Sequence, residues 1–259
     1  MAGALKSTSD GSTLVLTLSN PEFKNALGPE IYAAGVEALN AAENNPEIRS
    51  VVITGEGVNF SAGGNLHRLQ TNRELAPEVQ TQSIDGLHSW IDSIRTFPKP
   101  VIAAVEGAAA GAGFSLALAC DFVVAAENAV FVMAYSNVAL SPDGGGSWSL
   151  SRALPRALVT ELLMCGDRIG TARLHAMGLV NRQVTPGDAL NEALKLADTL
   201  NARAPNVLAS IKELVNDAAS NTLSEHLDAE RAHFVRNLQH PNGGEGISAF
   251  LEKRTPRYS

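Results

Sequence analysis

The chain has 259 residues, of which 45% are hydrophobic and 18% charged, proportions that exclude a disordered chain and allow one large core. Its formal net charge of −7 excludes a broad basic face, so we expect no nucleic-acid partner. The longest stretch of low charge, 107–120, is too short and glycine-rich to span a bilayer, and residues 1–6 lack a signal-peptide pattern, so we expect no membrane association and a cytoplasmic location.

The first half of the chain alternates between β-prone and helix-prone segments. Residues 5–9 and 14–19 are β-prone and flank an Asp-Gly dipeptide, which is typical of a hairpin turn. A helix is predicted over 29–44, because Gly-Pro-Glu opens the segment and Asn-Pro follows it. Two apolar runs, 51–55 and 101–105, are typical of buried strands.

The middle of the chain repeats this alternation with short connections. Between the two apolar runs lies a polar stretch, 65–78, followed by a helical pattern of apolar residues through Ile94. After Gly107 come a glycine-rich turn, a small-residue helix that ends at Cys120, and a strand over 122–125. This order predicts an α/β fold of stacked ββα units around a partly parallel core.

Two further features concern the cysteines and the C-terminal quarter. Cys120 and Cys165 lie in apolar runs without metal-ligand spacing, so we expect both to be reduced core residues and no metal to be bound. From about Asp188 the sequence becomes helix-forming, with breaks at Pro205 and Pro241. We therefore divide the chain into a mixed core, residues 1–196, and a helical region, residues 197–259.

Two glycine-rich turns are candidates for chemistry, one at 60–66 and one at 106–114, each directly after a predicted strand. A turn of this kind at a helix start leaves backbone N–H groups unpaired, and two of them converging on one point would stabilise an anionic thioester oxygen. Close packing of a helix on a sheet is the commoner explanation for either turn alone. A dinucleotide site is set aside, because neither the G-x-G-x-x-G spacing nor a P-loop lysine is present.

A third candidate is Asp143, which precedes three consecutive glycines and a helix predicted to begin near Ser147. The simpler interpretation is a carboxylate that the dipole of the helix N-terminus stabilises. The functional interpretation is a general base that the glycines leave accessible to a substrate. The motif by itself does not decide between them.

Taken together, these stretches resemble the crotonase, or enoyl-CoA hydratase/isomerase, superfamily. The resemblance implies a crotonase-like spiral of ββα units, with a C-terminal helical region that packs homotrimers or dimers of trimers. It also implies an acyl-CoA thioester as the partner, with coenzyme A as part of the substrate and no separate cofactor. The matching segments run nearly end to end and are 20–27, 60–66, 99–105, 107–121, 142–148, 160–180 and 245–254.

The resemblance also assigns residues to a site. It implies that the backbone N–H groups of Gly64 and Ala112 form an oxyanion hole, and Ala112 replaces the usual glycine without loss of the donor. It places Asp143 at the acid/base position of some family isomerases. The residues that it suggests for coenzyme A are Lys24, Ala26, Ala62 and Leu66 in the groove, and Phe250 and Lys253 toward the nucleotide of a neighbouring subunit's coenzyme A.

The departures from the family pattern point to a reaction. Family hydratases carry two glutamates, and the matching positions here are Ser115 and Tyr135, neither of which is an effective base near neutral pH. We therefore expect isomerisation, in which Asp143 removes a proton at C2 of the acyl group and returns it at C4. Residues 107–121 and 142–148 look most like the matching segments of family members linked to phenylacetyl-CoA breakdown, of the epoxyphenylacetyl-CoA isomerase or alternative oxepin-CoA hydrolase type.

Other interpretations stay open. One is an enoyl-CoA hydratase acting on a ring-derived oxepin-type or unsaturated acyl-CoA, with Asp143 and a water sharing the work. Another is an acyl-CoA-binding protein without catalysis, against which the retained Asp143 argues. Tyr135 is either a donor to substrate or a filler of the lost glutamate's space, and His67 either faces the acyl pocket or lies on the surface.

Overall fold

The core of the computed structural model, which describes residues 3–259, is a six-stranded sheet with the strand order β1-β2-β3-β4-β6-β9. The predicted hairpin is confirmed, because β1 and β2 pair antiparallel, and the remaining neighbours pair parallel. The sheet is therefore partly parallel, as the sequence predicts. Its strands are β1 (Ala4–Asp10), β2 (Thr13–Ser19), β3 (Ser50–Gly55), β4 (Val101–Val105), β6 (Phe122–Ala126) and β9 (Arg182–Val184).

A second sheet has three short strands, in the order β5-β7-β8. They are β5 (Ala108–Ala110), β7 (Val130–Val132) and β8 (Arg168–Gly170). The second glycine-rich turn therefore contains a strand, β5, that the sequence does not predict. Alanine is a poor strand former, and β5 exists because its backbone pairs in parallel with β7.

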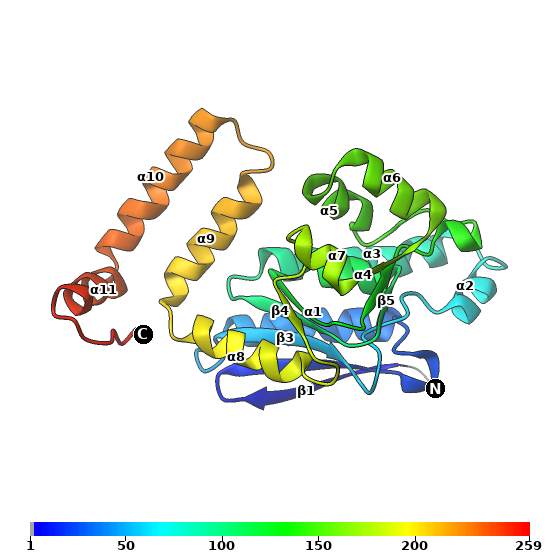
Figure 1. Cartoon of the computed structure of the whole chain (residues 1–259), viewed down its shortest axis with the longest axis horizontal. Helices are drawn as coiled ribbons and strands as arrows, with labels where there is room; N and C mark the ends of the chain where they lie inside the picture. Colours follow the sequence, from blue (N-terminus) through cyan, green and yellow to red (C-terminus); the bar gives the residue numbers. More distant parts are fainter. Residues whose placement is uncertain (1–2) are drawn as a thin grey trace.

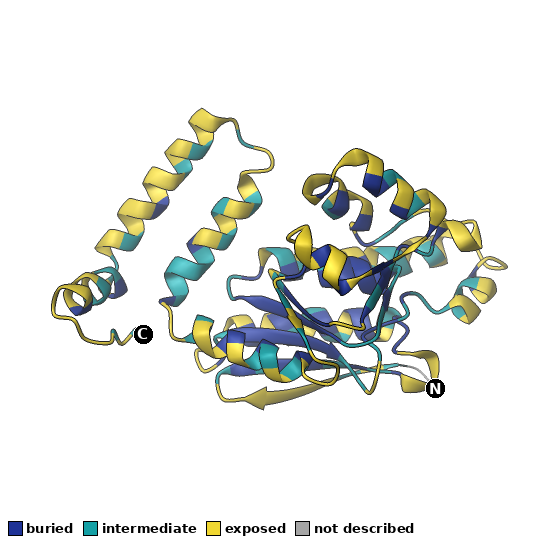
Figure 2. Cartoon of the chain, in the orientation of Figure 1, coloured by how far each residue is buried: buried dark blue, intermediate teal, exposed yellow. Residues whose placement is uncertain are grey.

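Helices cover both faces of the large sheet (Figure 1). On one face α1 (Pro29–Glu43) packs against α3 (Pro77–Thr96), and on the other α8 (Ala189–Asn201) packs across β3, β4 and β6. Alternate residues of β3 serve the two faces: Val51 and Ile53 belong to the main core, whereas Val52 packs with Ala193 of α8. The strands between these helices, including β3 and β4, are buried (Figure 2).

The polar stretch after β3 forms a helix that the sequence does not predict, α2 (Leu66–Asn72). Its N-cap is Asn65, whose side chain accepts hydrogen bonds from the backbone N–H groups of His67 and Arg68. Such a cap satisfies donors that a helix N-terminus leaves free. A short polar helix of this kind has too few apolar residues to give a periodic pattern.

Four more helices surround the smaller sheet, including the predicted small-residue helix and the predicted helix near Ser147. Cys165 ends one of them and is exposed, so the expectation that it is a core residue is wrong, whereas Cys120 is partly buried; both are free thiols. Within residues 3–259, no helix is both long and apolar enough to cross a bilayer. The four helices are α4 (Ala112–Ala119), α5 (Gly146–Ala153), α6 (Arg156–Cys165) and α7 (Thr171–Ala176).

The C-terminal helices extend away from the sheet (Figure 1). They are α9 (Pro205–Asp217), α10 (Leu223–Gln239) and α11 (Pro241–Leu251), and α9 packs against α10. The two predicted breaks, Pro205 and Pro241, are the first residues of helices, where a missing N–H costs nothing. Most of the surface of these helices is exposed in the single chain (Figure 2).

Candidate functional site

The two glycine-rich turns lie side by side. Ser61 donates its N–H to the carbonyl of Ala108 at 3.0 Å, and Ala110 donates to the carbonyl of Ser61 at 2.9 Å. A Cβ atom on Gly113 would lie 2.7 Å from the Cβ of Ser61, so only glycine permits this approach. The pairing holds the first turn against the N-terminus of α4.

Two backbone N–H groups are unpaired where the turns meet. Ala112 is the first residue of α4, and neither its N–H nor that of Gly64 donates a hydrogen bond to any group within residues 3–259. Gly63 has a φ of +83°, and a Cβ atom there would lie 3.1 Å from the nitrogen of Ala112. The structure thus brings Gly64 close to Ala112, at the positive end of a helix dipole, where an oxygen with developing negative charge is stabilised.

Asp143 lies on a glycine loop that packs against α4. A Cβ atom on Gly144 would lie 3.1 Å from the Cβ of Ser115, and one on Gly146 would lie 2.5 Å from its hydroxyl. Gly144 and Gly145 have positive φ angles, +58° and +74°, which glycine adopts without strain. The loop therefore places Asp143 one helical turn along α4 from Ala112.

Two side chains hold Asp143 in this position. The Tyr135 hydroxyl donates to the Oδ1 atom of Asp143 at 2.6 Å, and the Ser115 hydroxyl donates to its main-chain oxygen at 3.0 Å. Burial raises the pKa of Tyr135 far above its usual value, and the negative charge of Asp143 raises it further. The phenol is therefore protonated and acts as a donor at neutral pH.

A second tyrosine, Tyr32 on α1, also faces this region, and sequence analysis does not single it out. Tyr32 is buried, with its ring 6.4 Å from the ring of Trp90. Tyr32 packs against Gly86 of α3, next to Leu87, which contacts Gly144. Burial raises the pKa of Tyr32, and the negative charge of Asp143 raises it further. At the edge of this region Arg68 forms an exposed ion pair with Glu30 at 3.2 Å, so that Glu30 is not a free carboxylate.

The predicted groove residues of the first half of the chain lie together next to Gly64. Ala62 donates its N–H to the carbonyl of Lys24 at 2.8 Å, and the Lys24 side chain is exposed. Ala26 is buried in the same loop, and Leu66 is exposed at the start of α2. The loop is fixed by Asn25, whose side-chain amide donates to two main-chain carbonyls across the fold, at 2.8 and 2.9 Å.

The remaining predicted residues are elsewhere. Phe250 lies on α11 and is 84% exposed, Lys253 follows it, and α11 is at the opposite end of the molecule from α2 (Figure 1). Neither residue reaches the site of its own chain. His67 is exposed on α2 and contacts Phe23 edge to face, with ring centroids 6.0 Å apart.

An apolar cavity of about 480 Å³ lies away from this site. It is lined by residues of α9, including Ile211 and Val215, by the C-terminal end of α4, and by Trp148, whose ring lies between Arg95 and Arg152. Since α4 has eight residues, its two ends are about 12 Å apart. The cavity is therefore separate from the N–H groups of Gly64 and Ala112.

Comparison with known proteins gives one family. The model of the family described as enoyl-CoA hydratase/isomerase matches residues 8–259. A 1,2-epoxyphenylacetyl-CoA isomerase of Escherichia coli K12 is 36% identical over 247 residues, which cover 95% of this chain and 94% of that protein. A carnitinyl-CoA dehydratase of Salmonella enteritidis is also 36% identical, over 99% of this chain and 98% of the relative. A crystal structure described as an enoyl-CoA hydratase from Polaromonas sp. JS666 is 78% identical, with a TM-score of 0.99 over 99% of this chain and 100% of that one.

Proposed function

The chain belongs to the enoyl-CoA hydratase/isomerase family of acyl-CoA enzymes, and from this premise we propose that it is an isomerase that uses Asp143 as its single acid/base group. The observation that carries the proposal is how Asp143 is held. Ser115 and Tyr135 occupy the positions of the two hydratase glutamates, and both of them bind Asp143. The arrangement thus offers one carboxylate beside two free N–H donors.

The chemistry requires no further group. Asp143 takes a proton from C2 of a 3-enoyl thioester, so that a C–H bond breaks, an O–H bond forms and the electron pair moves onto the thioester oxygen. The N–H groups of Gly64 and Ala112 stabilise the resulting dienolate. Asp143 then returns the proton at C4, and the double bond moves from C3–C4 to C2–C3. Coenzyme A is part of the substrate, and no separate cofactor takes part.

The residues beside Gly64 are proposed to bind the coenzyme A portion. They are Ala26, Ala62 and Leu66, which lie together beside the proposed oxyanion donors. Lys24 is exposed at the same place and provides positive charge for the phosphate groups of coenzyme A. Positive charge is otherwise sparse in this acidic chain. For the acyl portion we propose a ring-derived substrate of phenylacetate catabolism, supported by the 36% identity to the epoxyphenylacetyl-CoA isomerase.

A second candidate function is hydration, favoured by the description of the 78% identical crystal structure as an enoyl-CoA hydratase and by the dehydratase relatives. In this alternative Asp143 activates a water for addition at C3 and the same N–H donors stabilise the enolate. Incorporation of solvent oxygen at C3 of the product would distinguish hydration from isomerisation.

The proposed assembly is a homotrimer, or a pair of trimers, built through the C-terminal helices. Supporting it are large apolar side chains that are exposed along α9, α10 and α11 of the single chain, more than an isolated surface usually carries. In such an assembly Phe250 and Lys253 would reach the coenzyme A of a neighbouring subunit. The apolar side chains are Ile211, Val215, Leu223, Leu227, Phe234, Val235, Leu238, Ile247, Phe250 and Leu251.

The role of Asp143 is tested by Asp143→Asn, which keeps the size of the side chain but removes its basicity. We expect kcat on 3-enoyl-CoA to fall by about 10²–10⁴-fold, the usual contribution of a general base. Binding of coenzyme A, measured by calorimetry, should stay near the wild-type value. The matched control is Asp198→Asn on the exposed side of α8, which should keep the wild-type rate. Activity retained by Asp143→Asn would reject the proposed mechanism.

A further inference from the structure

Tyr135 makes the shortest contact to the proposed base. Its hydroxyl lies 2.6 Å from Oδ1 of Asp143, within the range of a hydrogen bond to a charged oxygen. The phenol ring is buried and packs against Gly111, where a Cβ atom would lie 3.6 Å from the ring carbon that carries the hydroxyl. Because Gly111 is the N-cap of α4, the ring is fixed directly beside Ala112.

From this geometry we propose that Tyr135 is a positioning residue, which holds Oδ1 of Asp143 so that Oδ2 alone exchanges protons with the acyl group. The proposal rests on the proposed function, in which Asp143 is the base. A carboxylate with one oxygen occupied has a fixed orientation. The two proton transfers, at C2 and at C4, would then use the same oxygen and the same face of the substrate.

The surroundings of Asp143 leave this task to Tyr135. Ser115 of α4 binds the main-chain oxygen of Asp143 and not its carboxylate. The neighbours of the glycine loop on the other side are apolar, Leu87 of α3 and Met133. Tyr32 of α1 packs against Gly86 of α3, and no hydrogen bond joins it to Asp143 within residues 3–259. The other charged groups that act on Tyr32 are Arg68 and Glu30, which form an exposed ion pair.

Removal of the Tyr135 hydroxyl should change how kcat/KM depends on pH. A hydrogen bond from a neutral phenol favours the charged form of a carboxylate, so its loss favours the protonated form. The acid limb of the kcat/KM profile, where the base becomes protonated, should therefore move to higher pH in Tyr135→Phe. We also expect kcat on the plateau to fall about tenfold, because the carboxylate is then free to rotate.

One variant provides a matched control. Tyr32→Phe removes the other nearby hydroxyl, which is not bonded to Asp143, and should leave the acid limb where it is. An unchanged profile in Tyr135→Phe, in a variant with the thermal stability of the wild type, would overturn the proposal and leave Tyr135 as a packing residue.

A variant with an opposite expected effect covers the case in which Tyr135→Phe fails to fold. Tyr135→3-fluorotyrosine keeps the ring and has a more acidic, stronger donor, so the acid limb should move to lower pH. A limb that does not move with the fluorinated ring would overturn the proposal.

A measurement without substrate separates this proposal from the proposed function. The carboxyl carbon of Asp143 can be followed by ¹³C NMR in the free protein and assigned from its loss in Asp143→Asn. The titration curve should move to higher pH in Tyr135→Phe and stay in place in Tyr32→Phe. Should Asp143→Asn keep its activity, the proposed function fails, whereas the titration still decides whether Tyr135 controls the carboxylate. No difference between the wild type and Tyr135→Phe would overturn the proposal.

Discussion

The proposed role of Ala112 in the oxyanion hole depends on its backbone N–H and not on its side chain. Ala112 begins α4, its N–H donates to no group within residues 3–259, Gly63 packs against its nitrogen, and its methyl group is buried. Proline at the first position of a helix removes the N–H with little cost to the helix itself. This position therefore allows the donor to be removed while α4 is kept.

We predict that Ala112→Pro lowers kcat by about 10²–10³-fold, the usual effect of losing one oxyanion-hole donor. Ala112→Gly keeps the N–H and should retain most of the activity. The measurement is kcat for both variants, together with thermal unfolding, because Gly63 packs against the nitrogen of Ala112. Similar rates for a well-folded Ala112→Pro and the wild type would show that this donor does not stabilise the enolate.

The sequence marks the residue types of the site but not the contacts between them. The glycine turns and Asp143 were predicted because local motifs mark them, and the structure brings the two turns together. The sequence marks Ser115 and Tyr135 as positions where glutamates are absent, and Tyr135 also as a donor to substrate or a filler of the vacated space. That both of them bind Asp143 depends on how the glycine loop packs on α4, and no local pattern encodes this. Tyr32 was missed because it looks like any other member of the apolar face of α1.

Among the elements, those with strong local signals agree with the prediction. The hairpin, α1, the buried strands and the proline-started C-terminal helices all have such signals. Two of the unpredicted elements, α2 and β5, depend on their surroundings. The first relies on a side-chain cap by Asn65, and the second on pairing with β7. Weak local propensity was overridden there by capping and by tertiary pairing.

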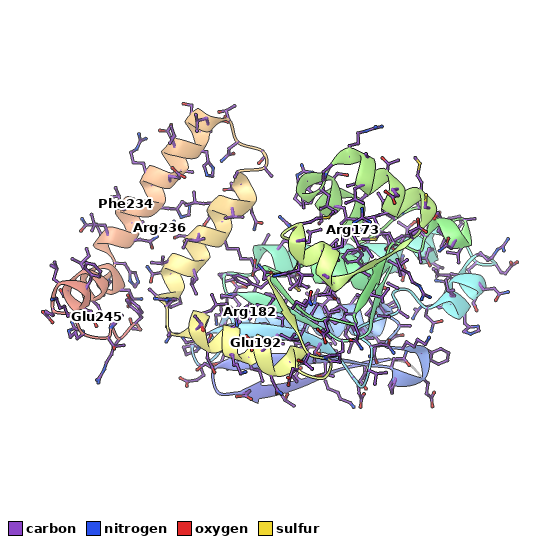
Figure 3. All side chains as sticks on the ribbon, viewed as in Figure 1. Arg173, Arg182, Glu192, Phe234, Arg236 and Glu245 are labelled. Carbon is purple, nitrogen blue, oxygen red and sulfur yellow. The ribbon has the colours of Figure 1, made fainter. Side chains whose placement is uncertain are left out.

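The exposed apolar side chains of the C-terminal helices predict that several chains assemble through them. Phe234 on α10 is 70% exposed and lies far from the sheet (Figure 3). We expect light scattering of the wild type to give three or six times the chain mass of 27.2 kDa. Phe234→Glu should lower the measured mass of the assembly, because a charge in an apolar interface is costly. It should also raise KM for acyl-CoA, since Phe250 and Lys253 would no longer reach a neighbour.

The matched control adds the same charge elsewhere. Asn40→Glu lies on the exposed side of α1 and should leave the mass and KM unchanged. A wild type that is monomeric at micromolar concentration would refute the proposed assembly. A Phe234→Glu variant with the wild-type mass would show that α10 is not the contact.

For the molecule as a whole, the order of elements and the family resemblance were sufficient to predict an α/β core of ββα units. The acidic net charge and the helical C-terminal region were equally readable from the sequence. The reaction is harder to predict, because the same scaffold carries isomerases, hydratases and dehydratases among the relatives of this chain. What separates these reactions is the number and placement of carboxylates around one oxyanion site, which depends on a few side chains.

The most direct test of the single-base account follows the ultraviolet absorbance of the conjugated thioester with two substrates. With 3-enoyl-CoA, the account predicts a rise in absorbance as the double bond moves into conjugation. With 2-enoyl-CoA, it predicts little change, because only one carboxylate is available and water is not added. A rapid fall in absorbance with 2-enoyl-CoA would show hydration of the double bond and would contradict the account.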